Sequence, residues 1–269
     1  MNNNKTPRKM QQHPQIELLK KIPQTEQKSK AWLEQRKQYL TSSDAGTALG
    51  LNHYQKPVEL LFSKCGAGKP FTGNVATRYG EKYEDEAVEM YCNAFGMIQN
   101  EFGLIPFTAV SRDRDELFIP GSEVLAGSPD GIAVSCENPY SCDPVLLEVK
   151  CPYKRKIVIG KCPDQYYPQV QLNMYICNLS KGDFIEYKPA KSIENIELNV
   201  VHFERNDEWL KENVPKLKEF WDLVLHYRNV GIEKHPEYCK YAWTEEKQKL
   251  ADMKVSTARQ PCCFSDDEN

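Results

Sequence analysis

The chain has 269 residues, of which 40% are apolar and 27% charged, with a formal net charge of −3. This composition is typical of a globular protein and excludes a fibrous or largely disordered chain. It also excludes a polycation, so a nucleic-acid partner would have to meet a local basic groove. The apolar runs are too short to span a bilayer, and the first residues lack the apolar core of a signal peptide. We therefore expect an intracellular protein, in the cytoplasm or nucleus, without a membrane partner.

In chain order, the first residues are polar, and we expect a disordered tail over 1–15. Apolar spacing then predicts helices over 16–40, 45–49, 57–65, 75–95 and 168–179, and a long helix capped by Asn206 and kinked at Pro215. Short apolar runs predict strands over 103–109, 116–119, 125–128, 132–134, 145–149, 184–187 and 196–203. A flexible tail is expected over 251–269. The pattern indicates one domain over 16–250, an α/β or α+β layer sandwich.

A glutamate and a lysine interrupt the most apolar of these strands. Alternate side chains of a strand share a face, so Glu148 and Lys150 point to the same side. The segment between Asp130 and Glu148 is rich in turn-forming residues, and a hairpin would bring the two carboxylates together. Carboxylates bind hard divalent cations, and a lysine can orient or deprotonate a water or neutralise phosphate charge. The alternative is a surface salt bridge on an edge strand.

Two further polar residues come from predicted helices. Glu84 shares the apolar stripe of its helix with Ala87 and Val88, where an unpaired carboxylate is costly. Gln169 lies at the start of its helix, where the amide could support a metal-bound water or the lysine. The structural alternatives are a glutamate that reaches solvent from the helix edge and a glutamine on the helix surface.

Four motifs follow one another in the order G-x-x-x-E-x-x-A (Gly80–Ala87), S-P-D-G (Ser128–Gly131), L-E-V-K-C-P (Leu147–Pro152) and Y-x-Q-x-Q-x-x-M (Tyr167–Met174). This order resembles the phage lambda exonuclease/YqaJ-type viral recombinase family of the PD-(D/E)XK nuclease superfamily. The resemblance covers most of the chain between the tails. It implies an α/β fold with a central mixed β-sheet flanked by helices, the restriction-endonuclease-like core.

The resemblance implies hydrolysis of a DNA phosphodiester with Mg²⁺, for which we expect Mn²⁺ to substitute. The catalytic residues that it implies are Glu84, Asp130, Glu148, Lys150 and Gln169. The implied metal ligands are Asp130, Glu148 and the Val149 carbonyl, with Glu84 helping to hold a second ion. Burial lowers the pKa of a lysine and nearby carboxylates raise it, and for Lys150 the residues alone do not decide between the two.

The opening segment, W-x-x-x-R followed by T-S-S-D-A-G-T-A-L-G-L-N-H-Y, also looks like that of the family. By position, the resemblance implies that Arg36, Thr41 and Ser43 bind the 5′-phosphate of a DNA end. A guanidinium binds phosphate bidentately, and hydroxyl and N–H groups at a helix start can complete an anion pocket. The alternative is that Ser43 or Asp44 merely caps the following helix while Arg36 is solvated.

The expected activity is therefore Mg-dependent exonucleolytic hydrolysis of linear double-stranded DNA, 5′→3′ from a 5′-phosphorylated end, in recombination, repair or viral replication. The alternatives are an endonuclease or RNA-cleaving nuclease on the same fold, and a catalytically silent nucleic-acid-binding recombination accessory protein. The family further suggests a homotrimer and a single-strand-annealing partner protein, inside the host cell if the protein is viral.

Ten cysteines are scattered along the chain without a C-x-x-C pair, and we expect them to be reduced and mostly buried. Some relatives hold an iron–sulfur cluster with one early cysteine and a late trio. Cys239, Cys262 and Cys263 lack a convincing trio spacing, so no cluster is expected. Cys136 and Cys142 flank one loop and could bind a metal or pair on oxidation, which leaves the role of this loop open.

Overall fold

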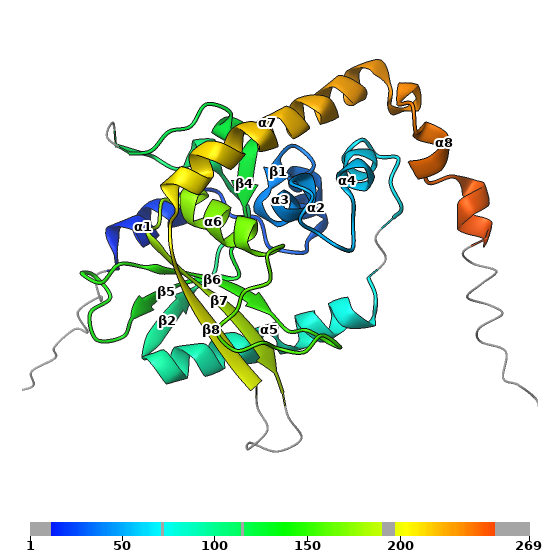
Figure 1. The fold of residues 1–269 in the computed structure, drawn as a ribbon. Coiled ribbons are helices and arrows are strands. Elements are labelled where there is room, and N and C mark those ends of the chain that lie inside the picture. Colours follow the sequence, from blue (N-terminus) through cyan, green and yellow to red (C-terminus); the bar gives the residue numbers. More distant parts are fainter. Residues whose placement is uncertain (1–11, 71–72, 114–115, 190–196, 251–269) are drawn as a thin grey trace, which may run out of the picture.

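The computed structural model describes residues 12–70, 73–113, 116–189 and 197–250. Its main sheet has five strands in the order β2-β5-β6-β7-β8 (Figure 1). These strands are β2 (Met97–Asn100), β5 (Gly131–Ser135), β6 (Val145–Lys150), β7 (Lys181–Lys188) and β8 (Glu197–Glu204). β6 and β7 pair in parallel, whereas the other neighbouring strands are antiparallel. The expected central mixed sheet is therefore confirmed.

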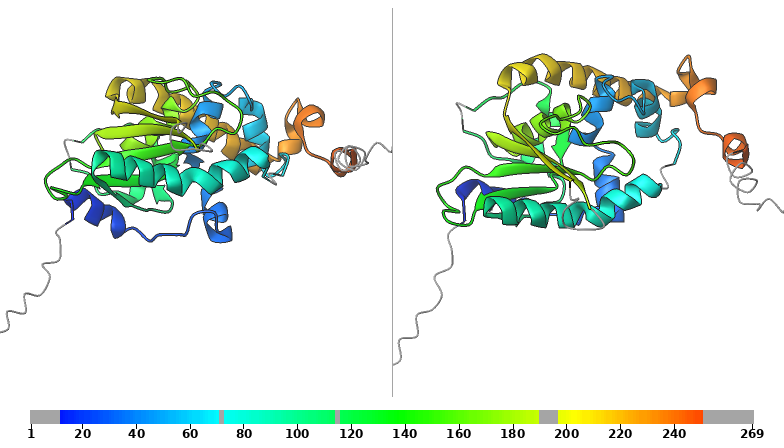
Figure 2. Two further views of the ribbon diagram at one scale, coloured as in Figure 1. Left: turned by 90° about the horizontal axis from the view of Figure 1, so that it is seen from below. Right: turned by 60° about the horizontal axis from the view of Figure 1, so that its bottom comes forward.

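Helices cover both faces of this sheet, as the views in Figure 2 show. On one face lies α5 (Val75–Phe95), whose buried residues Ala87, Val88 and Tyr91 pack against Leu147 and Val149 of β6. The other face is covered by α6 (Tyr167–Ile176) and α7 (Asp207–Val230), which belong to the larger core. β6 thus alternates its side chains between two cores, as its sequence predicts.

A small sheet joins the N-terminal region to the segment before β5. Its strand order is β1-β4-β3, with β1 (Leu40–Thr41), β3 (Ile105–Pro106) and β4 (Leu125–Gly127). β1 and β4 pair in parallel, which sets Thr41 beside Ala126. This pairing brings the opening segment of the chain next to the S-P-D-G motif.

Several N-terminal helices differ from the prediction. The single helix expected over 16–40 is wrong, because the chain forms α1 (Pro14–Lys20) and α2 (Lys30–Arg36) with a break between them. Pro23 lies in the break, Lys28 adopts a left-handed φ of 66°, and the Ser29 side chain caps α2. A proline and a strong capping residue end one helix and start another, although the apolar spacing continues across them.

The remaining helices and turns are short. They are α3 (Ser42–Ala48), α4 (Pro57–Lys64), α8 (Tyr238–Tyr241), and the 3-10 turns η1 (Phe107–Ala109), η2 (Ser122–Val124) and η4 (Ile232–Lys234). The strand expected over 116–119 is wrong, because the Ile119 N–H donates to the Tyr175 hydroxyl and not to a neighbouring strand. β2 was not predicted. α7 follows its Asn206 cap as predicted and continues through Pro215.

The predicted tail over 251–269 and most of that over 1–15 lie outside the described residues. α1 begins at Pro14, within the range predicted for the first tail. The eight cysteines of the described residues are free, as expected. The expectation that most of them are buried is wrong, since only Cys151 and Cys177 are buried, whereas Cys136 and Cys142 are exposed. Within the same residues, no helix is both long and apolar enough to cross a membrane.

Gly46 of α3 lies against the backbone that precedes α6. A Cβ atom at Gly46 would lie 2.3 Å from the Gln165 carbonyl oxygen, so Gly46→Ala must push the two segments apart. We expect this substitution to lower the free energy of unfolding by about 1–3 kcal/mol, measured by urea denaturation. Gly80→Ala in α5 is the matched control, because a Cβ atom there meets nothing within 4 Å. Equal urea midpoints for the two variants would show that the contact at Gly46 is not tight.

Candidate active site

A β-hairpin places the two acidic residues of the central motif side by side. Asp130 immediately precedes β5, and β5 pairs with β6 so that Gly131 faces Leu147. Continuing this register sets Asp130 opposite Glu148. The Val149 N–H donates to Asp130 Oδ2 at 2.7 Å, which fixes the Asp130 carboxylate at the end of the hairpin. The predicted approach of Asp130 and Glu148 is therefore confirmed.

Glu148 is completely buried and has a partner on each carboxylate oxygen. Lys150 donates to Oε1, and the Asn173 amide of α6 donates to Oε2 at 3.2 Å. Asn173 is itself completely buried, and its Oδ1 has no hydrogen-bond partner among the described residues. That oxygen lies against Gly127, where a Cβ atom would approach it to 2.4 Å. Gly127 therefore leaves the space in which Asn173 turns toward Glu148.

Glu84 reaches the same end of the sheet from α5, which covers the face opposite to α6. Its side chain is 29% exposed and forms an ion pair with Lys28 at 3.5 Å. The negative charge of Asp130 makes ionisation of Glu84 more costly. Burial raises the pKa of Glu84, and the negative charge of Asp130 raises it further, whereas Lys28 and Lys150 lower it.

Burial also raises the pKa of Glu148, to about 8; Lys150 opposes this shift, and Asp130 and Glu84 add to it. Burial alone would lower the pKa of Lys150, but the carboxylates of Glu148 and Asp130 raise it above its ordinary value. The effect of the carboxylates on the pKa of Lys150 thus outweighs that of burial, a question that the sequence left open. Lys150 keeps its proton and faces the site as a hydrogen-bond donor.

Gln169, the amide predicted to support the site, lies on α6 one helical turn before Asn173. It is half-buried, and no hydrogen bond joins it to the acidic residues in the described part of the chain. The structure brings Asn173 to Glu148 in its place. No role for Asn173 was predicted from the sequence, and it lies on the same face of the helix as Gln169. A role for Gln169 remains a prediction.

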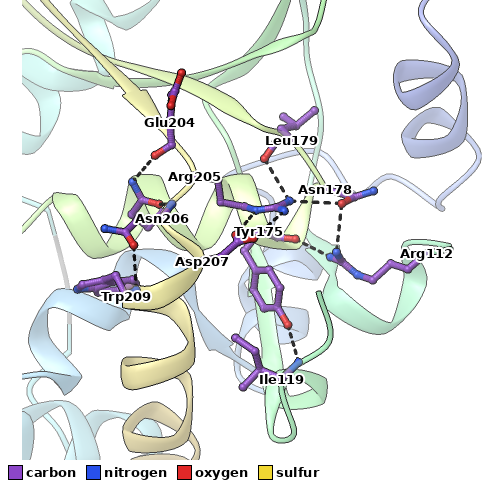
Figure 3. A network of polar contacts seen from close by, with 11 residues as sticks. Arg112, Ile119, Tyr175, Asn178, Leu179, Glu204, Arg205, Asn206, Asp207 and Trp209 are labelled. Carbon is purple, nitrogen blue, oxygen red and sulfur yellow. Dashed lines mark hydrogen bonds and ion pairs between the residues drawn. The ribbon is translucent and has the colours of Figure 1, made fainter. Parts of the chain in front are cut away.

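Two arginines hold the C-terminal end of the helix that carries Asn173, in the network drawn in Figure 3. Arg112 donates to the carbonyl oxygens of Tyr175 and, at 2.9 Å, Ile176. Arg205 lies on the other side of Asn178 and pairs with Asp207 at 2.7 Å. Cationic side chains at helix C-terminal carbonyls stabilise the helix end. α6 is therefore held at its C-terminal end, one turn beyond Asn173.

The three residues predicted to bind a 5′-phosphate lie together. Arg36 Nη2 donates to Thr41 Oγ1 at 3.1 Å and to Ser43 Oγ at 2.7 Å, while its guanidinium stacks 4.3 Å above the Trp32 ring. The Trp32 indole N–H in turn donates to the hydroxyl of Ser128, two residues before Asp130, at 3.1 Å. The cluster is thus connected to the hairpin through Trp32.

Two cationic side chains and one carboxylate meet at this cluster. Asp44 accepts from the Thr41 backbone N–H at 3.1 Å and pairs with Lys64 at 2.6 Å. Burial would raise the pKa of Asp44, but Lys64 and Arg36 hold it below its ordinary value. Asp44 is therefore ionised, and two cations share one carboxylate. The remaining positive charge suits an anion, although the same contacts also cap α3.

The carboxylates of the acidic site are oxygen ligands of the kind that hard divalent cations bind. Within the described residues, no three His, Cys, Asp or Glu side chains are grouped so that they could hold a metal ion together. Mg²⁺ does not need such a group, because it commonly binds through one or two carboxylates, waters and substrate phosphate. Asp130 and Glu148, with the Val149 carbonyl, meet this requirement. A cation would compete with Lys150 and Asn173 for the oxygens of Glu148.

Two cavities open at this end of the sheet, and Glu84 lines both. The first, of about 350 Å³, also contains Asp130, Lys28 and Gln27. The second, of about 330 Å³, lies between α5 and the segment after β6 and contains Lys150. The acidic residues are therefore accessible from either side of Glu84.

The mixed five-stranded sheet with helices on both faces (Figure 2) has the architecture of the PD-(D/E)XK fold. The crystal structure of an alkaline exonuclease (LHK-Exo) from Laribacter hongkongensis shares this fold, with a TM-score of 0.56 over 84% of this chain and 100% of that chain at 19% identity. The same enzyme in complex with dAMP gives a TM-score of 0.55 at 20% identity. At this identity the likeness establishes the fold alone.

Residues 31–180 match the YqaJ-like viral recombinase domain, and the chain belongs to that family. It is 32% identical over 188 residues to the uncharacterized protein R354 of Acanthamoeba polyphaga mimivirus, covering 66% of this chain and 32% of that protein. It is 26% identical over 193 residues to protein D345L of African swine fever virus, covering 64% of this chain and 52% of that protein. The chain thus spans a third to a half of these relatives.

Proposed function

We propose that the protein is a divalent-metal-dependent DNA exonuclease that hydrolyses linear double-stranded DNA from a 5′-phosphorylated end. The observation that carries the proposal is the convergence of Asp130, Glu148, Lys150 and Glu84 at one end of the sheet. Burial and the negative charge of Asp130 raise the pKa of both Glu84 and Glu148 at the mouth of two cavities, and such an arrangement is stabilised by a cation. Family membership supports the assignment to recombination nucleases.

Mg²⁺ is the cation that we propose, held by Asp130, Glu148 and the Val149 carbonyl, with Glu84 at a second position; Mn²⁺ would substitute for it. When bound, the cation lowers the pKa of a coordinated water and neutralises charge on the phosphate. Lys150, which keeps its proton, orients the attacking water or stabilises charge that develops on phosphate oxygens. Asn173 acts through Glu148, since its hydrogen bond sets the direction of that carboxylate.

The proposed end recognition comes from Arg36, Thr41 and Ser43. Their side chains lie within hydrogen-bonding distance of one another and present a guanidinium and two hydroxyls to an anion. Because Trp32 connects this cluster to Ser128, a 5′-phosphate bound here would hold the DNA end at a fixed separation from Asp130. A homotrimer and a single-strand-annealing partner, which the family suggests, remain part of the proposal.

The proposal is tested with a linear duplex that carries one 5′-phosphorylated end and a separate label on each strand. We expect the phosphorylated strand to shorten from its 5′ end with Mg²⁺ or Mn²⁺, and neither strand to shorten with EDTA. A covalently closed circle of the same sequence should stay intact, because an exonuclease needs an end. Cleavage of the circle would instead indicate an endonuclease. Digestion of an RNA duplex at an equal rate would contradict the assignment to DNA.

A further inference from the structure

Three tyrosines pack against one another beside the second cavity, and the proposed chemistry does not use them. Tyr79 and Tyr83 are one turn apart on α5, with ring centroids 4.7 Å apart. Tyr153 comes from the segment after β6, and its ring lies 5.3 Å from that of Tyr79. We propose that Tyr79, Tyr83 and Tyr153 are a stacking platform for a nucleobase of the DNA strand that is cut. The proposal rests on the proposed function and names a base-binding part of that site.

The position of the platform supports this role. The second cavity is lined by Tyr153 and, at the same time, by Lys150 and Glu84 of the acidic site. A nucleotide whose phosphate lies near Lys150 would therefore have its base within reach of the Tyr153 ring. This ring is 44% exposed, so one surface of the cluster is open to a ligand although Tyr79 and Tyr83 pack partly against the second core.

Cations accompany the rings. Lys82 Nζ lies 4.9 Å from the centre of the Tyr83 ring, and Lys154 Nζ lies 5.9 Å from that of Tyr153. Both lysines are exposed. Aromatic rings interspersed with cations are the combination by which proteins bind single-stranded nucleic acid, since bases stack on the rings and phosphates meet the cations.

The segment that carries Tyr153 is held in place. Arg155 forms an ion pair with Glu186 of β7, which is completely buried and also accepts from Asn199 Nδ2 at 3.1 Å. Asn199 Oδ1 accepts from the Gly160 N–H at 2.8 Å, farther along the same segment. A ring fixed in this way loses little conformational entropy when a base stacks on it.

The test measures binding of a short fluorescent single-stranded DNA by anisotropy, in a Lys150→Ala background so that the DNA stays intact. We expect Tyr153→Ala to weaken binding about 10-fold, and Tyr153→Trp to retain it. Tyr140→Ala is the matched control, because Tyr140 is 51% exposed on the loop between β5 and β6 and should bind as the background does. Equal affinities for Tyr153→Ala and Tyr140→Ala would overturn the proposal.

An abasic nucleotide, moved along the DNA one position at a time, separates stacking from packing. Where the base occupies the platform, its removal should weaken binding about 10-fold with Tyr153 present and have no further effect in Tyr153→Ala. If the tyrosines only pack α5 against the neighbouring segment, Tyr153→Ala lowers the melting temperature and every abasic position affects both proteins equally, which overturns the platform.

The same experiments keep the two proposals apart. If the wild type cleaves DNA but the Lys150→Ala background shows no coupling between Tyr153 and any base position, the platform alone is overturned. If the wild type cleaves no DNA but the Lys150→Ala background shows the coupling, the nuclease function is overturned and the platform is supported as a binding site for single-stranded DNA.

Discussion

Replacing Lys150 by alanine is expected to abolish DNA hydrolysis, lowering the rate by about 100- to 1,000-fold or more, while leaving DNA binding largely intact. Lys150 forms an ion pair with Glu148, so its ammonium is a charged donor within the acidic site. Removing it deprives the attacking water or the phosphate oxygens of a preorganised donor. The measurement is the initial rate of shortening of a labelled linear duplex, together with the Kd for the same DNA in Ca²⁺.

The control for this experiment is Lys181→Ala. Lys181 lies at the opposite end of the same pair of strands, where it pairs with Asp143 at 3.1 Å in a half-exposed setting. Lys181→Ala therefore removes a lysine from an ion pair without changing the acidic site, and the rate of this variant should equal that of the wild type. Lys150→Met keeps the aliphatic stem and should be as inactive as Lys150→Ala. Full activity in either Lys150 variant would refute the catalytic assignment.

The second large effect is expected at the DNA end. Arg36→Ala should reduce the preference for a 5′-phosphorylated over a 5′-hydroxyl end by about 10- to 100-fold, the loss typical of a hydrogen bond to a charged group. The wild type should degrade the phosphorylated end faster because Arg36, which lies within hydrogen-bonding distance of Thr41 and Ser43, would donate charge-assisted hydrogen bonds to the phosphate. The measurement is the ratio of initial rates on two otherwise identical duplexes.

A ratio is needed because Arg36 also stabilises the start of α3. A folding defect would lower both rates and leave their ratio unchanged. Lys37→Ala is the matched control, since it removes a positive charge at the next residue, which is 65% exposed and pairs only locally with Glu34. If Arg36→Ala keeps the wild-type ratio, the cluster serves only to cap α3, and the proposed 5′-end recognition is wrong.

Much of the site could be predicted from local patterns. The period-two alternation of β6 and the turn-rich segment before it were enough to place Asp130 beside Glu148. The helix over 75–95 was predicted with the bounds that the structure shows, because its apolar stripe continues from an Asn74 cap to Gly96. These features depend on neighbours within one strand, one hairpin or one helix, for which sequence spacing is sufficient information.

The errors have two sources, which are local signals that interrupt an apolar pattern and contacts between distant segments. Residues 16–40 keep a helical apolar spacing, yet the proline and the Ser29 cap divide them, and Leu40 joins β1 by pairing with Leu125. Likewise, Gln169 and Asn173 share one face of α6, and they differ by about 6 Å along its axis. Only the packing of α6 over β6 determines which amide reaches Glu148.

The sequence by itself determined the family, the hairpin and the identity of the acidic and basic residues, because these follow from motifs and from the periodicity of single elements. The tertiary structure decided which groups complete the site. It brought Asn173 and Lys28 to the carboxylates, connected Arg36 to Ser128 through Trp32, and buried Glu148 beside Lys150 so that the lysine keeps its proton. Burial and the approach of charges from separate elements set these properties, and no single segment of the chain contains that information.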